Sequence, residues 1–442
     1  MAKQATLQAD ILIAGSGPGG ATLARALARA GKRVILFERG IDHRRRAYYG
    51  TYLGALLYAD RMSLVFTQEG LNIIRPLMVG GATSMYCGCA ALPPGWLKDK
   101  YAVDILPEAR ETITELGIAP LPPELRGEAS TRIAEAGRAL GYDWQPQLKF
   151  MQPARSRRFD CGAKCMLGCR CGVKWSAAEW VDEAVAAGAV LQTGSRILRV
   201  LYEGGQVTGL VGERSGRPFA ARAGTVILCA GGIGTPRILQ NSGFPEAGRG
   251  MAMDTTVMLY GFSKKKGIGS EPPMTWSWED PQAGFMLSTL MDPWLLYPLI
   301  NSLKGLRYAL TWPRWNHVLG VMIKLKDEIS GGVFPGGRIS KPLTPADQER
   351  LRHAEAISRR ILVEAGAEAD TIFMTPLRGT HPSATVRLGE LVDANLETCI
   401  RGLYVCDASV FPEALDRPTV LTIIGLAKRL ARRLAPAAHS AA

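Results

Sequence analysis

The sequence lacks any apolar run long enough to cross a bilayer. The longest, Phe285–Ile300, is shorter than the roughly 20 residues a membrane-spanning helix needs, and Asp292 and two prolines interrupt it. No apolar segment with a small-residue cleavage site follows Met1, so we expect a cytoplasmic rather than an exported protein. Internal repeats and low-complexity tracts are also missing, which excludes fibrous and solenoid architectures.

Nucleic-acid-binding motifs are absent as well, although the net charge is +13. The basic residues gather only in short clusters such as Arg44–Arg46 and Lys264–Lys266, and a solvated basic surface is the simplest interpretation of each. We therefore expect no nucleic-acid partner. A basic balance also suits peripheral contact with an anionic membrane or an acidic redox protein.

Glycine, in contrast, is abundant and concentrated in turns. A strand pattern at Asp10–Ala14, a glycine turn, a helix pattern at Ala21–Ala30 and a second strand pattern at Val34–Phe37 together predict a βαβ unit. The turn Gly15-Ser-Gly-Pro-Gly-Gly20 fits the spacing G-x-G-x-x-G.

Each glycine of that turn has a physical reason to be there. Gly15 permits a tight turn, Gly17 lets the backbone approach a pyrophosphate, and Gly20 permits close packing of helix on strand. Glu38 ends the second strand, about 20 residues downstream, where a carboxylate accepts hydrogen bonds from ribose hydroxyls. The unit predicts a bound dinucleotide but does not distinguish NAD from FAD.

Six further parts of the sequence resemble the FAD-dependent glucose–methanol–choline (GMC) oxidoreductases. Gly80-Gly81 resembles the glycine pair that lies against the flavin, Ala230-Gly231 resembles that family's alanine–glycine turn, and Ile197 falls where the family presents backbone to the adenine. The segments His381–Gly389, Gly402–Pro412 and Arg417–Ile423 resemble the C-terminal signature, in which the Asp407-Ala408 pair contacts the phosphate–ribityl region. The resemblance implies FAD as cofactor, with Thr419 of the last segment at its site.

The resemblance implies a fold of the α/β class: a discontinuous Rossmann-like FAD-binding domain with an inserted α+β substrate domain. We place the FAD-binding domain at residues 1–90, 155–240 and 379–442, and the substrate domain at 91–154 and 241–378. The apolar region Trp276–Met322 is expected to be core; if exposed, it would mark a substrate pocket or a membrane-surface patch.

His381 sits, by the same resemblance, at the position of the active-site histidine near the flavin ring. Oxidising an alcohol requires removal of the hydroxyl proton as hydride leaves carbon, and an imidazole can take that proton at neutral pH. The alternative is a histidine that only satisfies structural hydrogen bonds.

Arg417 departs from the family pattern, because most relatives place Asn or His before the proline at this point, here Pro418. A guanidinium can anchor an anionic substrate or stabilise an oxyanion, but it cannot act as a base. We list Arg417 with His381 as candidate catalytic residues; the alternative is an Arg417 that points to solvent.

Four cysteines crowd one short segment: Cys161, Cys165, Cys169 and Cys171. Clustered thiolates suit soft metals and iron–sulfur clusters, and the segment resembles a region of bacterial FAD-dependent sugar dehydrogenases in which cysteines hold such a cluster. Buried free thiols or a disulfide are the alternatives.

The sequence thus predicts a flavin dehydrogenase that oxidises an apolar or cyclic alcohol and passes electrons to a quinone, cytochrome or redox protein. A flavin-dependent carbon–carbon desaturase or saturase, and a flavin-carrying electron-transfer subunit, remain alternatives.

Overall fold

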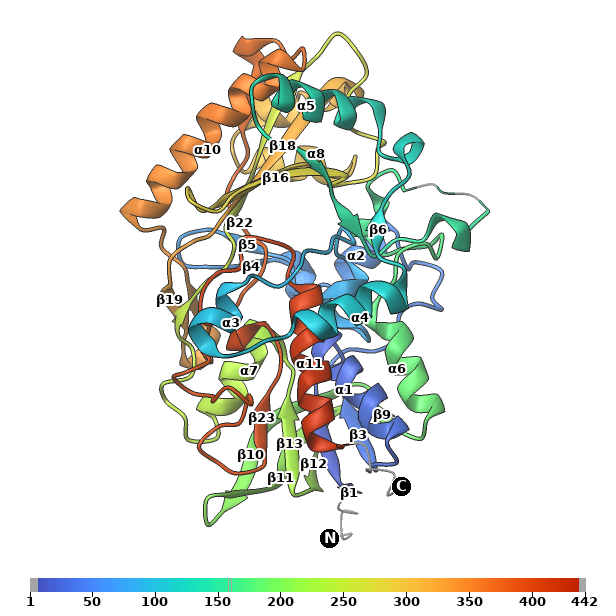
Figure 1. Ribbon diagram of the computed structural model, residues 1–442, viewed down its shortest axis with the longest axis vertical. Coiled ribbons are helices and arrows are strands. Elements are labelled where there is room, and N and C mark those ends of the chain that lie inside the picture. The colour runs from blue at the N-terminus through green and yellow to red at the C-terminus, as the bar shows by residue number, and fades with distance from the viewer. Residues whose placement is uncertain (1–6, 158, 160, 437–442) are drawn as a thin grey trace.

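A five-stranded parallel sheet forms the centre of the lower half of the molecule in Figure 1. The computed structural model describes residues 7–157, 159 and 161–436. The strand order is β23-β13-β2-β3-β9, and β2 and β3 are buried along their whole length, as expected for parallel strands covered on both faces. The bounds are β2 Ile11–Ala14, β3 Val34–Phe37, β9 Val190–Gln192, β13 Thr225–Leu228 and β23 Leu403–Val405.

Helices from distant parts of the chain pack beside this sheet. α1 (Pro18–Arg29) lies against both α6 (Ala177–Ala186) and the C-terminal helix α11 (Val420–Leu434). Ser176 and Glu179 form a capping box that begins α6. α7 (Gly231–Gln240) follows β13 directly. A second sheet of order β1-β12-β11-β10 packs nearby, with Phe219 of β12 stacked on Phe37 of β3. Its bounds are β1 Leu7–Gln8, β10 Ser195–Glu203, β11 Gln206–Arg214 and β12 Arg217–Arg222.

A nine-stranded, largely antiparallel sheet forms the upper half, with α5 (Glu128–Ala139) and α10 (Pro345–Glu364) on its outer side (Figure 1). The segment 241–378, which the sequence assigned to the substrate domain, supplies its central antiparallel strands. These are β15 Thr256–Phe262, β16 Trp276–Asp280, β17 Phe285–Thr289 and β18 Val318–Leu325, joined by β4 Val65–Phe66, β5 Asn72–Ile73, β7 Gln145–Pro146, β21 Phe373–Met374 and β22 Arg378–Gly379.

Each half has its own hydrophobic core. α3 (Trp96–Tyr101) and α4 (Leu106–Leu116) contribute to the lower core, although the sequence assigned residues 91–154 to the substrate domain. The remaining elements are α2 Tyr52–Tyr58, α8 Leu296–Ser302, α9 Leu306–Ala309, β6 Ala119–Pro120, β8 Leu148–Lys149, β14 Arg249–Met251, β19 Ser330–Val333 and β20 Ile339–Ser340.

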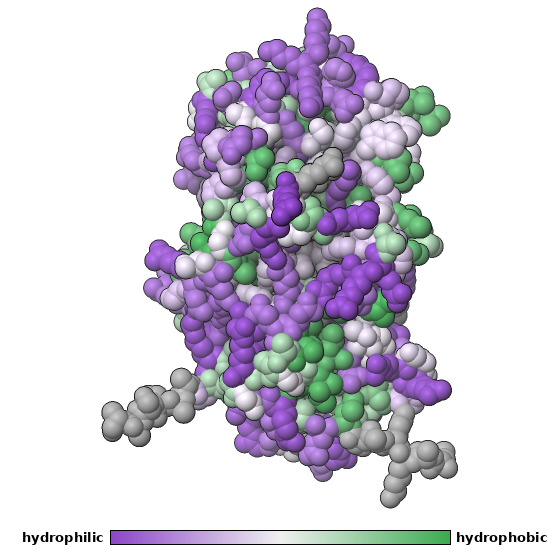
Figure 2. Space-filling model, turned by 90° about the vertical axis from the view of Figure 1, so that its right-hand side faces the viewer, coloured by the Kyte–Doolittle hydropathy of each residue, from purple (hydrophilic) through white to green (hydrophobic). Residues whose placement is uncertain are grey.

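The face of the molecule seen in Figure 2 is mostly hydrophilic, with separate hydrophobic patches. Within the described ranges, no helix combines the length and apolar character needed to cross a bilayer. The region Trp276–Met322 divides into two parts: β16 to β18 supply core residues as expected, whereas several leucines of α8 and α9 are exposed.

Candidate functional site

The three glycines of the first turn occupy the conformations that the dinucleotide motif requires. Gly15 has a φ of +108°, and a Cβ there would lie 2.2 Å from the carbonyl oxygen of Cys229. A Cβ on Gly20 would lie 1.9 Å from the carbonyl oxygen of Gly15, so only glycine allows this approach of helix to strand. At Gly17, no protein atom lies within 4 Å of an added Cβ. The turn therefore leaves open space for a ligand at Gly17, whereas Gly15 and Gly20 are tightly packed against neighbouring backbone.

Glu38 braces this turn from the end of β3. Its Oε2 accepts hydrogen bonds from the backbone N–H and hydroxyl of Ser16, at 3.1 and 2.6 Å. Its Oε1 accepts from the N–H of Gly40 at 2.7 Å. The carboxylate is buried beside the turn, where a ribose would lie in a dinucleotide complex.

Asp407 makes the corresponding brace from the C-terminal segment. Its Oδ2 accepts from the N–H of Gly231 at 2.8 Å and from the hydroxyl of Thr235 at 2.5 Å, and its Oδ1 accepts from the N–H of Ser409 at 2.8 Å. Burial raises the pKa of Asp407, and these hydrogen bonds oppose that rise. Two segments about 175 residues apart are thereby joined.

Glu38 and Asp407 both line one cavity of about 450 Å³. Two of the glycines that the sequence singled out, Gly20 and Gly80, do not line this cavity. Gly81 packs closely on the first turn, because a Cβ there would lie 3.0 Å from the Cα of Gly17. The other residues that the sequence singled out for the cofactor do line the cavity: Gly15, Gly17, Glu38, Gly81, Ile197, Ala230, Gly231, Asp407, Ala408 and Thr419.

Arginines on the cavity wall are functional candidates that the sequence analysis missed. Arg39, Arg75, Arg196 and Arg237 all line it. Burial lowers the pKa of Arg75, and the neighbouring Arg39 and Arg237 lower it further, while Asp60, 3.2 Å away, opposes the shift. Four guanidinium groups around an open glycine turn suit the negative charge of a pyrophosphate. This cavity therefore fits the cofactor that the sequence predicted.

His381 lines the same cavity and is held from its Nδ1 side. Nδ1 lies 2.8 Å from Oδ2 of Asp254, which is buried and follows β14. The ammonium of Lys324, in β18, lies 3.4 Å from the same nitrogen. If Nδ1–H donates to the carboxylate, Nε2 is left as the proton acceptor. Neither Asp254 nor Lys324 was recognised in the sequence, because no motif marks them.

The surroundings of His381 hold its imidazole neutral at neutral pH. Burial lowers the pKa of His381 below its ordinary 6.5, and the charge of Lys324 lowers it further. Asp254 opposes both effects. Burial likewise lowers the pKa of Lys324. A neutral imidazole with a fixed tautomer is the form required of a general base.

Arg417 forms ion pairs with two acidic residues outside the cavity lining. Its Nε donates to Oδ1 of Asp416 at 2.9 Å, and its NH2 group lies 3.2 Å from Oε2 of Glu279. It is not among the residues that line the cavity. Burial raises the pKa of Asp416 to about 6, despite the opposing charge of Arg417.

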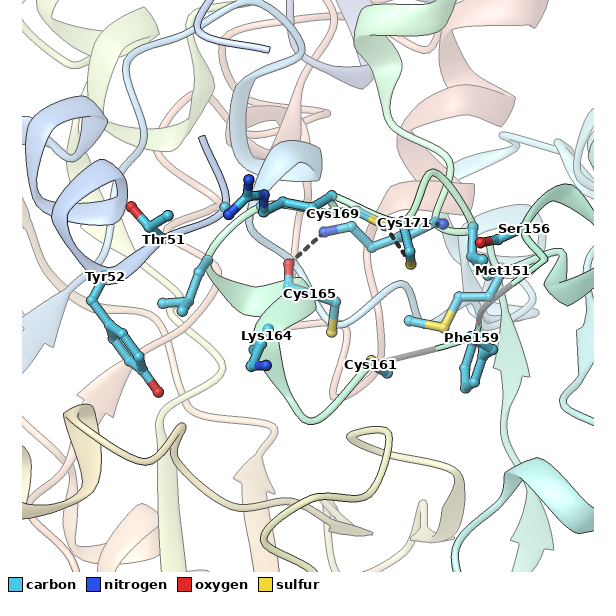
Figure 3. A pocket seen from close by; sticks show the side chains of 16 residues that line it. Thr51, Tyr52, Met151, Ser156, Phe159, Cys161, Lys164, Cys165, Cys169 and Cys171 are labelled. Carbon is cyan, nitrogen blue, oxygen red and sulfur yellow. Dashed lines mark hydrogen bonds between the residues drawn. The ribbon is translucent and has the colours of Figure 1, made fainter. Parts of the chain in front are cut away.

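The four clustered cysteines line a second cavity, of about 700 Å³ (Figure 3). Sγ of Cys169 lies 3.6 Å from Sγ of Cys171, and Cys161 and Cys165 form another hydrogen-bonded pair. That bond lowers the pKa of Cys161 and, together with burial, raises the pKa of Cys165. All nine cysteines are free thiols. Within the described residues, no group of three or more His, Cys, Asp or Glu is arranged to hold a single metal ion.

A buried lysine joins the cysteine segment to the segment that follows the glycine pair Gly80-Gly81. The ammonium of Lys174 donates to the carbonyl oxygens of Ser84, Tyr86 and Cys165, at 3.0, 2.8 and 2.8 Å. Ser84 and Tyr86 belong to the segment that begins with the glycine pair Gly80-Gly81. The cysteine segment is thus attached directly to the segment beside the first cavity.

The parallel sheet, the glycine turn and the cavity with its arginines and histidine define a dinucleotide-dependent oxidoreductase with an inserted substrate domain. The GMC oxidoreductase family models match this chain at residues 90–261 and 338–427. The chain belongs to the GMC oxidoreductase family and is an FAD-dependent oxidoreductase that acts on CH–OH donors.

Known relatives cover the chain to different extents. An uncharacterized protein of Methanocaldococcus jannaschii is 27% identical over 96% of this chain and 99% of its own length. A long-chain-alcohol oxidase of Arabidopsis thaliana is 23% identical over 94% of this chain and 66% of its own length. Two GMC-type oxidoreductases of Mycobacterium tuberculosis are 28% identical, and the match spans 58% of this chain but 43% of their length.

Solved structures share the fold. A formate oxidase variant of Aspergillus oryzae superposes with a TM-score of 0.76 at 15% identity, covering 99% of each chain. A pyridoxine 4-oxidase from Mesorbium loti superposes with a TM-score of 0.74 at 19% identity, covering 97% of this chain and 100% of that one. The predicted α/β fold with FAD-binding and substrate domains is confirmed.

Proposed function

We propose that this protein oxidises an apolar or cyclic alcohol to a carbonyl compound, with His381 as the base. The observation that carries the proposal is that His381, oriented by Asp254, lines the same cavity as the dinucleotide-binding turns. The likeness to a long-chain-alcohol oxidase supports an apolar substrate. FAD, when bound, supplies the acceptor for the hydride.

Different residues of the chain would bind FAD and accept the proton. Gly15, Gly17, Glu38 and Asp407, with the four arginines, would hold FAD. Nε2 of His381 would take the hydroxyl proton, and Asp254 would stabilise the resulting imidazolium. Asp254 thereby provides the partner that the expected Asn or His would have supplied, which favours alcohol oxidation over a desaturase or saturase reaction.

Anaerobic addition of a straight-chain primary alcohol or a cyclic alcohol tests this proposal. Bleaching of the flavin with formation of an aldehyde or ketone supports it. An alkene product would instead support the desaturase alternative, and an unbleached flavin with every alcohol tried would favour an electron-transfer subunit.

Lys324→Met and Asp254→Asn are expected to shift the pH profile of flavin reduction in opposite directions. The rate should fall as pH drops through the pKa of His381, below 6.5, because the base becomes protonated. Removing Lys324 raises that pKa and moves the acid limb to higher pH; removing the carboxylate of Asp254 lowers it and moves the limb to lower pH. Rapid-mixing measurements across pH check both shifts.

Asp416→Asn is the control for this experiment, because the pKa of Asp416, about 6, falls in the same range. An acid limb that disappears in this variant, or that moves the same way in the Lys324 and Asp254 variants, would assign the titration to another group.

The cysteine cavity further supports an iron–sulfur cluster between the flavin site and an acceptor other than oxygen. Four cysteines line one space of about 700 Å³, and Lys174 ties it to the flavin-side segment. Such a cluster, when bound, passes electrons singly to a quinone, cytochrome or redox protein. Its ligands would be Cys161, Cys165, Cys169 and Cys171, each losing a proton on binding.

Cys165→Ser is expected to remove iron and inorganic sulfide from protein purified without air, because it deletes one of the four proposed thiolate ligands. Metal analysis and EPR spectroscopy of the dithionite-reduced protein measure the loss. Cys399→Ser, at an exposed position, is the matched control and should leave both unchanged. Anaerobically purified native protein that contains no iron would exclude the cluster.

A further inference from the structure

The helices α8 and α9 present a row of leucines to solvent. Leu299 lies in α8 and Leu306 in α9, while Leu303 and Leu310 directly follow these two helices, and the exposed fractions of the four side chains lie between 62% and 71%. Amphipathic helices of folded proteins normally turn such a row toward the core. In α8, however, the side chains that face the core are Tyr297 and Asn301, which are fully buried. The apolar side of this segment therefore has no partner within the described part of the chain.

The neighbouring helix α2 repeats the pattern. Leu53, Leu56 and Leu57 lie on one exposed side of it, at spacings of three and one. Met62 and Leu64 continue the exposed apolar surface in the following turn. We call these side chains, together with the four leucines of α8 and α9, the leucine face.

The two parts of the leucine face adjoin each other. The backbone N–H of Leu295 donates to the hydroxyl of Tyr52 at 3.3 Å, and Leu296 packs against the same small cluster as Tyr52. Scattered exposed leucines are normal on protein surfaces, but a contiguous set on two contacting helices indicates a contact surface.

Basic residues flank the helices of the leucine face in the sequence. Lys304 and Arg307 lie beside α9, and Arg45, Arg46 and Arg61 lie before and after α2. None of these five forms an ion pair with another described residue. From Trp294 to His317 the chain contains no aspartate or glutamate. The charge at this surface is therefore positive and unneutralised.

We propose that the leucine face docks on the surface of an anionic lipid bilayer. Leucines framed by Lys and Arg match the acyl region and the headgroups of such a surface. Trp294 and Trp312, paired with their ring centroids 4.6 Å apart at one end of the face, have the amphipathic rings that prefer the interface. A second copy of this chain would bring like charges together, which disfavours a dimer through the same surface.

Docking in this way would bring the cysteine cavity close to the membrane. Thr51 and Tyr52 belong to the start of α2 and also line that cavity (Figure 3). A lipid-soluble acceptor could then collect electrons without crossing water. The docking itself is independent of the proposed alcohol oxidation, because vesicle binding is measured without substrate.

Sedimentation of the FAD-loaded protein with vesicles tests the docking. Vesicles of phosphatidylcholine with phosphatidylglycerol should bind the protein, binding should weaken with added salt, and vesicles of phosphatidylcholine alone should bind less. Leu303→Ser combined with Leu306→Ser should weaken binding at least about tenfold, because two exposed leucines no longer enter the acyl region. FAD content and thermal stability should not change.

Val363→Ser, at an exposed apolar position on α10, is the matched control and should bind as the native protein does. Arg45→Glu combined with Arg46→Glu should weaken binding to the anionic vesicles only. Native protein that binds neither vesicle, or a double leucine variant that binds undiminished, would overturn the proposal. A leucine face that holds two copies together instead would appear as a native dimer that the leucine variant converts to a monomer, without vesicle binding.

Discussion

Replacing His381 by glutamine is expected to slow flavin reduction by about 10²- to 10⁴-fold, the usual contribution of a positioned general base. Glutamine keeps a hydrogen-bonding side chain next to Asp254 but cannot take a proton at neutral pH. Because His381 contributes one position among many on the cavity lining, FAD should stay bound. Stopped-flow absorbance under anaerobic conditions, with a primary alcohol in excess, measures the rate.

His353→Gln is the matched control, because His353 lies exposed on α10, in the other half of the molecule. Its flavin reduction should equal that of the native protein. A His381 variant that reduces its flavin at the native rate would show that another group removes the proton, and that His381 only satisfies structural hydrogen bonds.

Gly17→Val is expected to produce a folded protein that binds FAD poorly. No protein atom lies within 4 Å of a Cβ at this position, and Gly17 has a negative φ, so the chain accommodates the side chain. The methyl groups would instead occupy cavity space that the pyrophosphate needs. Overpacking of this kind costs about 1–3 kcal/mol, equivalent to roughly 5- to 150-fold weaker binding.

Flavin fluorescence during titration of the apoprotein measures that loss, and circular dichroism checks the fold. Gly224→Val is the matched control: Gly224 also has open space around an added Cβ and no left-handed backbone, but it lies on the surface, outside the cavity lining. Equal FAD affinity in both variants would mean that the cofactor does not pass over Gly17.

Local patterns predicted the parts of the molecule that are built locally. The strand, glycine turn and helix around Gly15 to Gly20 appear as β2 and α1, within a few residues of the expected bounds. The helix α6 likewise begins at a local signal, the capping box of Ser176 and Glu179. In each case, residues close in sequence determine the element through hydrogen bonds and apolar spacing.

Contacts between distant segments could not be predicted in the same way. Asp254 and Lys324 reach His381 only because β15 and β18 pair in the antiparallel sheet, and no motif surrounds either residue. Arg75, in a loop, and Arg196, in β10, likewise line the cavity from positions that depend on the whole fold.

Periodicity alone also left open which side of a helix faces inward. The leucines at α8 and α9 belong to the apolar region Trp276–Met322, for which the sequence favoured core. Tyr297 and Asn301 occupy the inner side instead, so the leucines turn outward. An apolar row shows that a helix has two unlike sides, but not which medium each side meets.

The hydrogen bonds from Asp407 to Gly231 and Thr235 also constrain the order of events during synthesis. Strand β23 and helix α11 are translated last, yet both belong to the half of the molecule that is translated first. While the ribosome is still synthesising the substrate domain, β13 therefore has one edge without its neighbouring strand β23. We expect a nascent chain that has not yet reached Leu403 to need a chaperone more than the finished protein does, and FAD to bind only after Asp407 and α11 have been synthesised.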